Sequence, residues 1–221
     1  MRVRFLIDGF NVYHGLRTAA WDRSMQLGGP GSHAGTKWFD LPRYCRDYVR
    51  TVLPHGAQLE RILYFSALAT HLQASEPDVV ARHHTYLDCL RDQDVEVILG
   101  RFKETTGRTC PTCGGAIVRH EEKETDVAIA AQLMAAFAED RCDTAVLVTG
   151  DTDMTPVVKA ARATFPTKKI GFLFPHGRSH SELQKLADSS ARTTQRMCLS
   201  LQMADPFVKR DGSVITKPPS W

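Results

Sequence analysis

The stretch Val146-Leu147-Val148-Thr149-Gly150-Asp151-Thr152-Asp153 decides how this chain folds. A short apolar run of this kind is typical of a strand buried on both faces, as in a parallel sheet. Residues 154–163 then repeat apolar side chains at helical spacing, with Pro156 in the first turn, where a missing N–H costs little. Asp151 and Asp153 are therefore expected where a strand ends and a helix begins. In open α/β sheets, ligands bind at that edge.

Two interpretations of this acid pair are open. The carboxylates can stay ionised by holding a hard divalent cation among oxygen ligands. Alternatively, Asp153 only caps the helix and Asp151 only finishes a turn. The pair alone does not decide between them, so other acids in similar positions matter.

Apolar runs alternate with helical patterns along the rest of the chain. Strands are predicted at 3–7, 59–65, 95–99, 144–148 and 169–174. Helices are predicted at 12–17, 41–53, 78–93, 125–138, 154–163 and 181–187. This alternation predicts an α/β fold with a mostly parallel central sheet of about five strands and helices on both faces. The helix at 125–138 is so apolar that it is expected to be buried against the sheet.

The chain divides into a main domain, residues 1–192, and a C-terminal extension, residues 193–221. At 221 residues it is long enough for one substantial core. The main domain is interrupted by a glycine-rich stretch at 22–37, expected to be a loop, and by a cysteine-bearing loop at 104–120. In the extension, Asp211-Gly212 between apolar segments predicts a β-hairpin.

The composition excludes several classes of protein. A chain that is 43% hydrophobic and 24% charged is an ordinary globular protein rather than a disordered one. No apolar run approaches the roughly 20 residues of a membrane span, so no membrane association is expected. The first residues do not resemble a signal peptide, and a cytoplasmic location is the resulting expectation. The net charge of +3 does not by itself identify nucleic acid as a partner, but the basic stretch at 159–185 would suit a phosphate backbone.

The cysteines show one pattern, Cys110-Pro111-Thr112-Cys113, which looks like half of a zinc ribbon. Structural zinc needs four ligands, and His120, His83 or His84, or another subunit, would have to complete the site. A metal-free loop is the alternative interpretation. The other four cysteines lie among apolar neighbours and are expected to be small core residues: Cys45, Cys89, Cys142 and Cys198.

Two further acids occupy element ends. Asp8 closes the first predicted strand, and Asp126 opens the helix at 125–138. In a doubly wound sheet the first and fourth strands flank the switch point, so these acids would converge with Asp151 and Asp153. Four carboxylates would repel one another unless a cation neutralised them, and Mg²⁺ or Mn²⁺ suits hard oxygen ligands. Each acid also has a local alternative, a turn residue at Asp8 and a helix-dipole partner at Asp126.

Other side chains have supporting roles in this hypothesis. Asn11 and the Thr149 hydroxyl could orient the metal ligands or a metal-bound water. Candidate phosphate contacts, each with the alternative of being an ordinary surface residue, are Arg101, Lys103, Arg178 and His180.

Three segments of the chain resemble the NYN domain family, a branch of the PIN-like ribonucleases. These segments are Phe5-Leu6-Ile7-Asp8-Gly9-Phe10-Asn11, Glu122-Lys123-Glu124-Thr125-Asp126-Val127 and Val148-Thr149-Gly150-Asp151-Thr152-Asp153. The resemblance covers most of residues 2–192 and is specific in order and spacing. It implies a PIN-like three-layer α/β/α sandwich and metal-dependent cleavage of RNA, with an endonucleolytic mode. By motif position, Asp8, Asp126, Asp151 and Asp153 correspond to the family's metal-binding acids, with Asn11 close by.

The mechanism that follows is in-line attack of water on an RNA phosphodiester, assisted by one or two divalent ions. One alternative is a non-catalytic nucleic-acid-binding module on the same fold. A second is an aspartyl-phosphate phosphohydrolase, but enzymes of that type need a second Asp where this chain has Phe10. A homodimer is compatible with the sequence.

Overall fold

The computed structural model describes residues 1–27, 29, 35–109, 112 and 116–221. A seven-stranded sheet forms the centre of the molecule, in the order β4-β3-β2-β1-β5-β6-β7. Its strands are β1 Arg2–Asp8, β2 Gln58–Ala67, β3 Val95–Thr109, β4 Ala116–Lys123, β5 Thr144–Val148, β6 Lys169–Phe174 and β7 Ser189–Arg192. All neighbouring strands pair in parallel except β3 and β4, which are antiparallel. The predicted fold class, a mostly parallel PIN-like α/β sheet, is confirmed.

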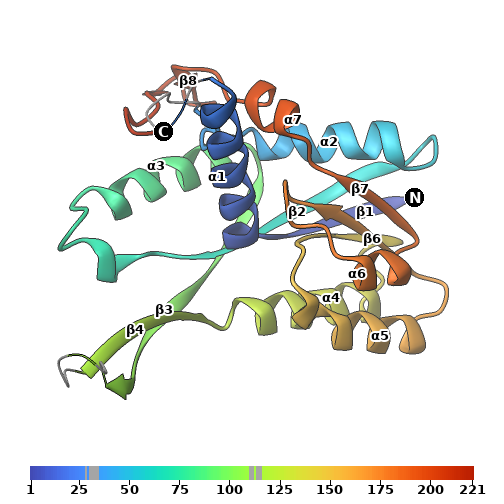
Figure 1. Cartoon of the computed structure of the whole chain (residues 1–221). Helices are drawn as coiled ribbons and strands as arrows, with labels where there is room; N and C mark the ends of the chain where they lie inside the picture. Colours follow the sequence, from blue (N-terminus) through green and yellow to red (C-terminus); the bar gives the residue numbers. More distant parts are fainter. Residues whose placement is uncertain (28, 30–34, 110–111, 113–115) are drawn as a thin grey trace.

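Helices cover both faces of the sheet (Figure 1). They are α1 Gly9–Gln26, α2 Leu41–Val52, α3 Val79–Asp92, α4 Thr125–Ala138, α5 Thr155–Thr164, α6 Ser181–Leu186 and α7 Gln195–Ser200, with short 3-10 turns η1 Thr70–Leu72 and η2 Thr152–Met154. One core cluster joins α1, α2, α3 and α7 to the sheet, and the other joins α4, α5 and α6. Phe5 and Ile7 of β1 belong to the first cluster and Leu6 to the second, because side chains alternate along a strand.

The first helix differs from its predicted range. It was expected at 12–17, with a loop from residue 22, but α1 continues to Gln26. Only its first turns bury an apolar face, through Val12, Leu16 and Ala19, while Trp21 is 58% exposed. The second half of α1 therefore lacks the apolar periodicity by which a helix is recognised. Residues 28 and 30–34 of the predicted glycine-rich loop lie outside the described residues.

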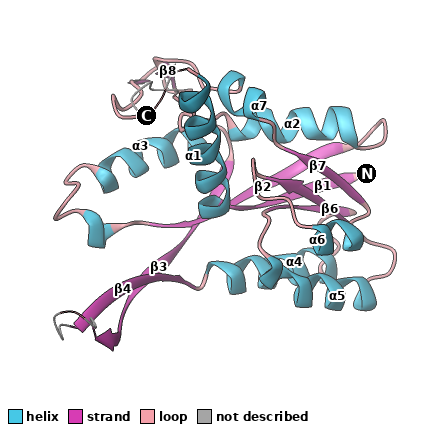
Figure 2. Cartoon of the chain, in the orientation of Figure 1, coloured by secondary structure: helices cyan, strands magenta, loops and turns pink. Residues whose placement is uncertain are grey.

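The predicted cysteine-bearing loop at 104–120 is wrong in its secondary structure. The strand expected to end at Leu99 continues to Thr109 and pairs with β4, from Arg101 opposite Lys123 to Thr109 opposite Ala116. These two strands form an arm that extends away from the sheet (Figure 2). Its sequence is rich in threonine and other β-branched residues, which favour strands but give no strict alternation of apolar and polar positions.

Helix α4 is buried on one face rather than all round. Ile129, Leu133 and Phe137 are buried, but Val127 is 73% exposed. The helix belongs to an outer layer, so its far side meets solvent whatever its composition.

The C-terminal extension contains the predicted hairpin. Strands β8 Phe207–Val208 and β9 Val214–Ile215 pair antiparallel, and Gly212 has a φ of 83°, which the turn requires. In the described part of the chain, no helix is long and apolar enough to cross a membrane.

Candidate active site

The candidate site lies at the carboxyl ends of β1 and β5, the two strands between which the connections change direction. β1 pairs in parallel with both β2 and β5, and Ile7 lies opposite Val148. Asp8 and Thr149, the residues that follow, are therefore neighbours. This is the switch point at which open α/β sheets bind ligands, and it is where the sequence predicted the site.

Asp8 is the buried centre of this region, with only 6% of its surface exposed. One carboxylate oxygen, Oδ1, accepts the backbone N–H of Asn11 at 2.9 Å and so caps α1. The other, Oδ2, accepts the Thr149 hydroxyl at 3.0 Å. These bonds fix the orientation of the carboxylate and connect the ends of the two strands.

The turn after β5 is held from both sides. The Asn11 side-chain oxygen accepts the backbone N–H of Gly150 at 3.0 Å, and the Thr149 oxygen accepts the N–H of Asp151 at 3.1 Å. A Cβ on Gly150 would lie 1.8 Å from the carbonyl oxygen of Arg178, so only glycine fits. Asp151 Oδ1 accepts the N–H of Asp153 at 3.0 Å, which starts the η2 turn.

The pKa values of the carboxylates show that the predicted acids share one electrostatic environment. Burial raises the pKa of Asp8 to about 6, against the lowering effect of its two hydrogen bonds, and the charges of Asp126 and Asp151 raise it further. The pKa of Asp126 is raised by partial burial and by the charges of Asp151 and Asp153. The structure therefore brings the acids of β1, α4 and the turn after β5 close enough to repel one another.

Glu122 is a fifth acid that the sequence analysis did not place in the site. Burial raises its pKa to about 7, a hydrogen bond from the Thr125 hydroxyl opposes the shift, and the charges of Asp8 and Asp126 add to it. It lies near the end of β4, opposite Phe102 of β3. The only sequence signal was its position four residues before Asp126, and its orientation followed from a strand that had not been predicted.

The donor set of the cluster suits a hard divalent cation, because every candidate ligand is a carboxylate or hydroxyl oxygen. In the orientations of the described side chains, no three His, Cys, Asp or Glu groups are close enough together to hold an ion. Asp8 is fixed by its hydrogen bonds, whereas Asp126 and Asp153 are exposed. A common ion would therefore require the exposed carboxylates to turn towards Asp8.

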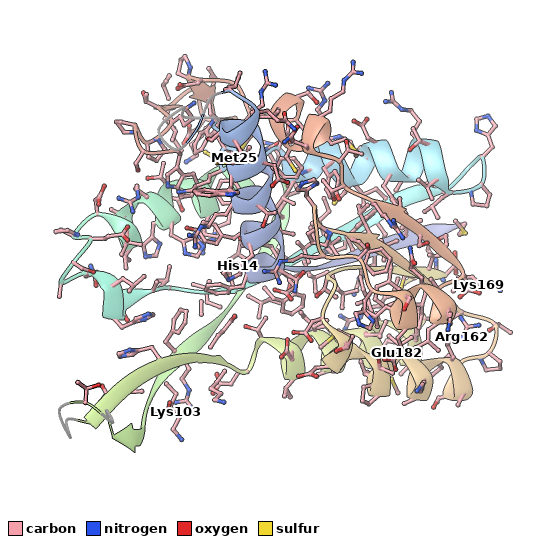
Figure 3. All side chains as sticks on the ribbon, viewed as in Figure 1. His14, Met25, Lys103, Arg162, Lys169 and Glu182 are labelled. Atoms are coloured by element: carbon pink, nitrogen blue, oxygen red, sulfur yellow. The ribbon has the colours of Figure 1, made fainter. Side chains whose placement is uncertain are left out.

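The predicted phosphate contacts have different surroundings. Arg101 forms an ion pair with Glu124 at 2.7 Å, and Lys103 is exposed on the arm (Figure 3). Arg178 packs its backbone against Gly150, and its Nε is buried without a hydrogen-bond partner among the described residues. His180 caps α6.

The predicted zinc ligands Cys110 and Cys113 lie outside the described residues. Of the imidazoles considered as further ligands, His120 stacks on His71 with ring centroids 4.3 Å apart, and His83 lies 3.4 Å from the Ser66 hydroxyl. The other four cysteines are free and buried, as predicted.

A mostly parallel sheet with helices on both faces, matched by the NYN family model, is a nuclease-like fold of the PIN-like class. The chain belongs to the NYN domain family, whose model matches residues 2–193.

One relative and one solved structure extend this comparison. The chain is 29% identical over 204 residues to 6-hydroxy-3-succinoylpyridine 3-monooxygenase HspA of Pseudomonas putida, which covers 79% of this chain and 60% of that protein. The chain thus spans about three fifths of the length of this relative. A solved protein of unknown function from Vibrio parahaemolyticus superposes with a TM-score of 0.52 at 20% identity, over 87% of this chain and 93% of that one. This likeness shows the fold alone.

Proposed function

We propose that this protein is a Mg²⁺- or Mn²⁺-dependent ribonuclease that cleaves RNA phosphodiester bonds endonucleolytically. The observation that carries the proposal is the position of Asp8, a buried carboxylate that hydrogen bonds from Asn11 and Thr149 hold where β1 and β5 end, among the charges of Asp126 and Asp151. An unneutralised cluster of this kind destabilises the ionised form of each acid, and a cation reverses that effect. Membership of the NYN domain family supports the same conclusion.

In this proposal each residue of the site has a separate role. Asp8 and Asp151 would be the direct ligands of the ion, and Asp126 and Asp153 would hold it directly or through water. Asn11 and Thr149 keep the two strand ends in register through their hydrogen bonds to Gly150 and Asp8. Glu122 adds a further carboxyl group beside Asp8 and Asp126. A bound divalent ion would supply activation of water and stabilisation of the departing oxygen.

Basic side chains around the acids would hold the RNA backbone. The backbone of Arg178 lies against the turn that carries Asp151, and its guanidinium would have to turn towards a phosphate held near the acids. Arg101, Lys103 and His180 would contact phosphates farther along the strand. These are sequence-independent contacts, and binding through them would weaken with salt.

The test is cleavage of end-labelled RNAs, structured and unstructured, with Mg²⁺ or Mn²⁺ and with excess EDTA. Asp151→Asn removes one charge at nearly constant shape and should abolish cleavage while leaving the melting temperature nearly unchanged. Asp88→Asn is the matched control, because Asp88 is 54% exposed on α3 and pairs only with Arg91 in the described structure. Cleavage that persists in EDTA, or in Asp151→Asn, would contradict the proposed mechanism. RNA binding without cleavage would favour the non-catalytic module instead.

A second candidate function comes from the relative, whose name describes a monooxygenase acting on a pyridine derivative. The observation that favours it is a cavity of about 490 Å³ beside the acids, lined by Tyr13, Tyr64 and Phe102, which is large enough for a heteroaromatic acid. Oxygen consumption that depends on such an acid and on a reductant would support this candidate.

A further inference from the structure

The cavity beside the acid cluster has an aromatic lining. It lies between α1, the end of β2, the η1 turn, α3 and the base of the arm, and its volume is about 490 Å³. The rings that line it include those of Phe10, Tyr13, Tyr64, Tyr86, Phe102 and Trp221. Phe10 and Phe102 meet edge to face at 5.5 Å, so the helix and the arm form one continuous aromatic wall. A planar ring is the ligand shape that such a wall accommodates.

Two cations lie at the same cavity. The Arg17 guanidinium and the Lys37 ammonium are each 5.8 Å from the centre of the Tyr13 ring. Partial burial lowers the pKa of Lys37, the charges of Arg17 and Arg82 lower it further, and the charge of Glu76, which also lines the cavity, opposes the shift. Arg82 is paired with Glu76 and Asp78, whereas in the described part of the chain no ion pair engages Arg17 or Lys37. Two cations without an ion pair in the described structure, beside an aromatic ring, suit a ligand that carries an anionic group.

The cavity shares its wall with the acid cluster. Gly9 and Phe10 follow Asp8 directly, and a Cβ on Gly9 would lie 2.6 Å from the Tyr64 ring. The charges of Asp8 and Glu122 both raise the pKa of the Tyr64 hydroxyl, after burial as the largest cause. A ligand in the cavity would therefore lie next to the proposed catalytic carboxylates.

A second hollow continues from this cavity. It shares His14, Arg17, Lys37 and Trp221 with the cavity and reaches Arg178, whose backbone packs against Gly150. Figure 3 labels His14 on α1, near the end of the helix that adjoins the sheet. The cations therefore extend from the cavity, around α1, to the turn after β5. This arrangement suits a chain with several phosphates better than a small ligand with one acidic group.

We propose that the cavity binds one unpaired nucleotide of the RNA substrate, with its base against Tyr13 and Phe10 and a phosphate at Arg17 and Lys37. This inference rests on the proposed ribonuclease function and adds to it a nucleotide-binding cavity beside the acids. A base enclosed in this cavity cannot be paired, because the cavity leaves no room for a second strand. The anchored nucleotide would place a neighbouring phosphodiester at Asp8 and Asp151.

The experiment measures binding of 5′-nucleoside monophosphates in excess EDTA, where metal-dependent cleavage cannot occur, by calorimetry. Lys37→Met should weaken binding about tenfold through loss of the phosphate contact, and Tyr13→Leu should do the same through loss of stacking. Tyr13→Phe keeps the ring and should bind as the parent does. Arg50→Met is the matched charge control, because Arg50 is 77% exposed on α2 and does not line the cavity. Thermal melts establish that each variant is folded.

Binding of related ligands shows whether the cavity recognises a whole nucleotide or only an aromatic ring or an anion. The matching nucleoside and inorganic phosphate should each bind at least tenfold more weakly than the monophosphate. A heteroaromatic carboxylate such as nicotinate that binds as tightly as the monophosphates would overturn the proposal, as would binding that Lys37→Met and Tyr13→Leu leave unchanged. Failure of the ribonuclease proposal looks different: nucleotides would bind in the cavity, yet no RNA would be cleaved with Mg²⁺ or Mn²⁺.

Discussion

The Asn11 side-chain oxygen accepts the backbone N–H of Gly150 at 3.0 Å, across the gap between the first turn of α1 and the turn after β5. Asn11 is 8% exposed, so this bond is shielded from water. It joins two segments that are 139 residues apart in sequence. The position of Asp151 relative to Asp8 depends on it.

Asn11→Ala should therefore weaken both the fold and the site. The Gly150 N–H would lose its partner, and an unsatisfied buried donor costs about 1–3 kcal/mol. We expect a loss of this size in the free energy of unfolding, measured with urea, together with slower RNA cleavage at saturating metal. Thr51→Ala, which removes an exposed hydroxyl on α2, is the control and should change neither. An Asn11→Ala variant with unchanged stability would mean that water replaces the side chain.

Gly150→Ala should disrupt the site more strongly. The new methyl group would lie 1.8 Å from the Arg178 carbonyl oxygen, so the segment after β6 would have to move. We expect loss of cleavage and a fall in melting temperature. The control is Gly56→Ala, which has no atom within 4 Å of the added methyl and carries only the strain of its φ of 86°, about 1 kcal/mol. Equal effects of the two substitutions on cleavage and melting temperature would show that the segment around Arg178 moves at no cost in stability.

The acid cluster should make stability fall as the pH rises. The folded pKa of Asp8 is about 6 and that of Glu122 about 7, both above the values for exposed acids. The folded state thus holds protons that the unfolded state has released, so the free energy of unfolding decreases between about pH 4 and pH 7 and is level above. For Asp8 the loss is about 3 kcal/mol.

Urea unfolding between pH 4.5 and 8 in EDTA measures this effect. Other groups titrate in the same window, and burial lowers the pKa of His83 to about 4, which contributes the opposite slope. The contribution of the cluster is therefore the difference between the parent and Asp8→Asn or Glu122→Gln, whose stability should fall less with pH. Mn²⁺ should restore the parent's stability above pH 6. Parallel curves for parent and variants would contradict the raised pKa values.

The elements with a regular pattern of apolar residues could be predicted from the sequence. The β-branched run before Thr149 and the apolar run before Asp8 are typical of buried strands, and their parallel pairing follows from the helices between them. Once both strands were assigned, the convergence of their terminal acids followed from topology alone.

The other features could not be predicted, because they depend on contacts between residues far apart in the sequence. The short strand β7, Ser189–Arg192, forms because it pairs with the edge of β6 that β5 does not occupy. Glu122 acquires its environment from the pairing of β4 with β3, which brings it opposite Phe102. The cavity beside Tyr13 joins α1, α3 and the arm, so neither its shape nor its unpaired cations could be predicted from spacing.

A final prediction concerns the opposite end of β1, far from the acids. Arg4 has a side chain only 5% exposed, and its guanidinium binds both oxygens of Glu60 on β2, at 2.8 and 3.0 Å. Removal of Glu60 would leave a buried charge without its partner. Because Glu60 is itself 28% exposed, we expect Glu60→Ala to cost about 3 kcal/mol, the lower end of the range for broken buried pairs.

Two further variants test this prediction. Glu96→Ala breaks a pair with Arg61 on the same sheet in which both side chains are 49% exposed and 3.8 Å apart, so the change should stay below about 1 kcal/mol. Arg4→Met combined with Glu60→Met removes both charges and should recover most of the loss caused by Glu60→Ala. RNA cleavage below the melting temperature should be unchanged in all three variants, because this pair lies at the amino end of the strand and the acids at its carboxyl end. A Glu60→Ala variant no less stable than Glu96→Ala would show that water reaches Arg4 and replaces the carboxylate.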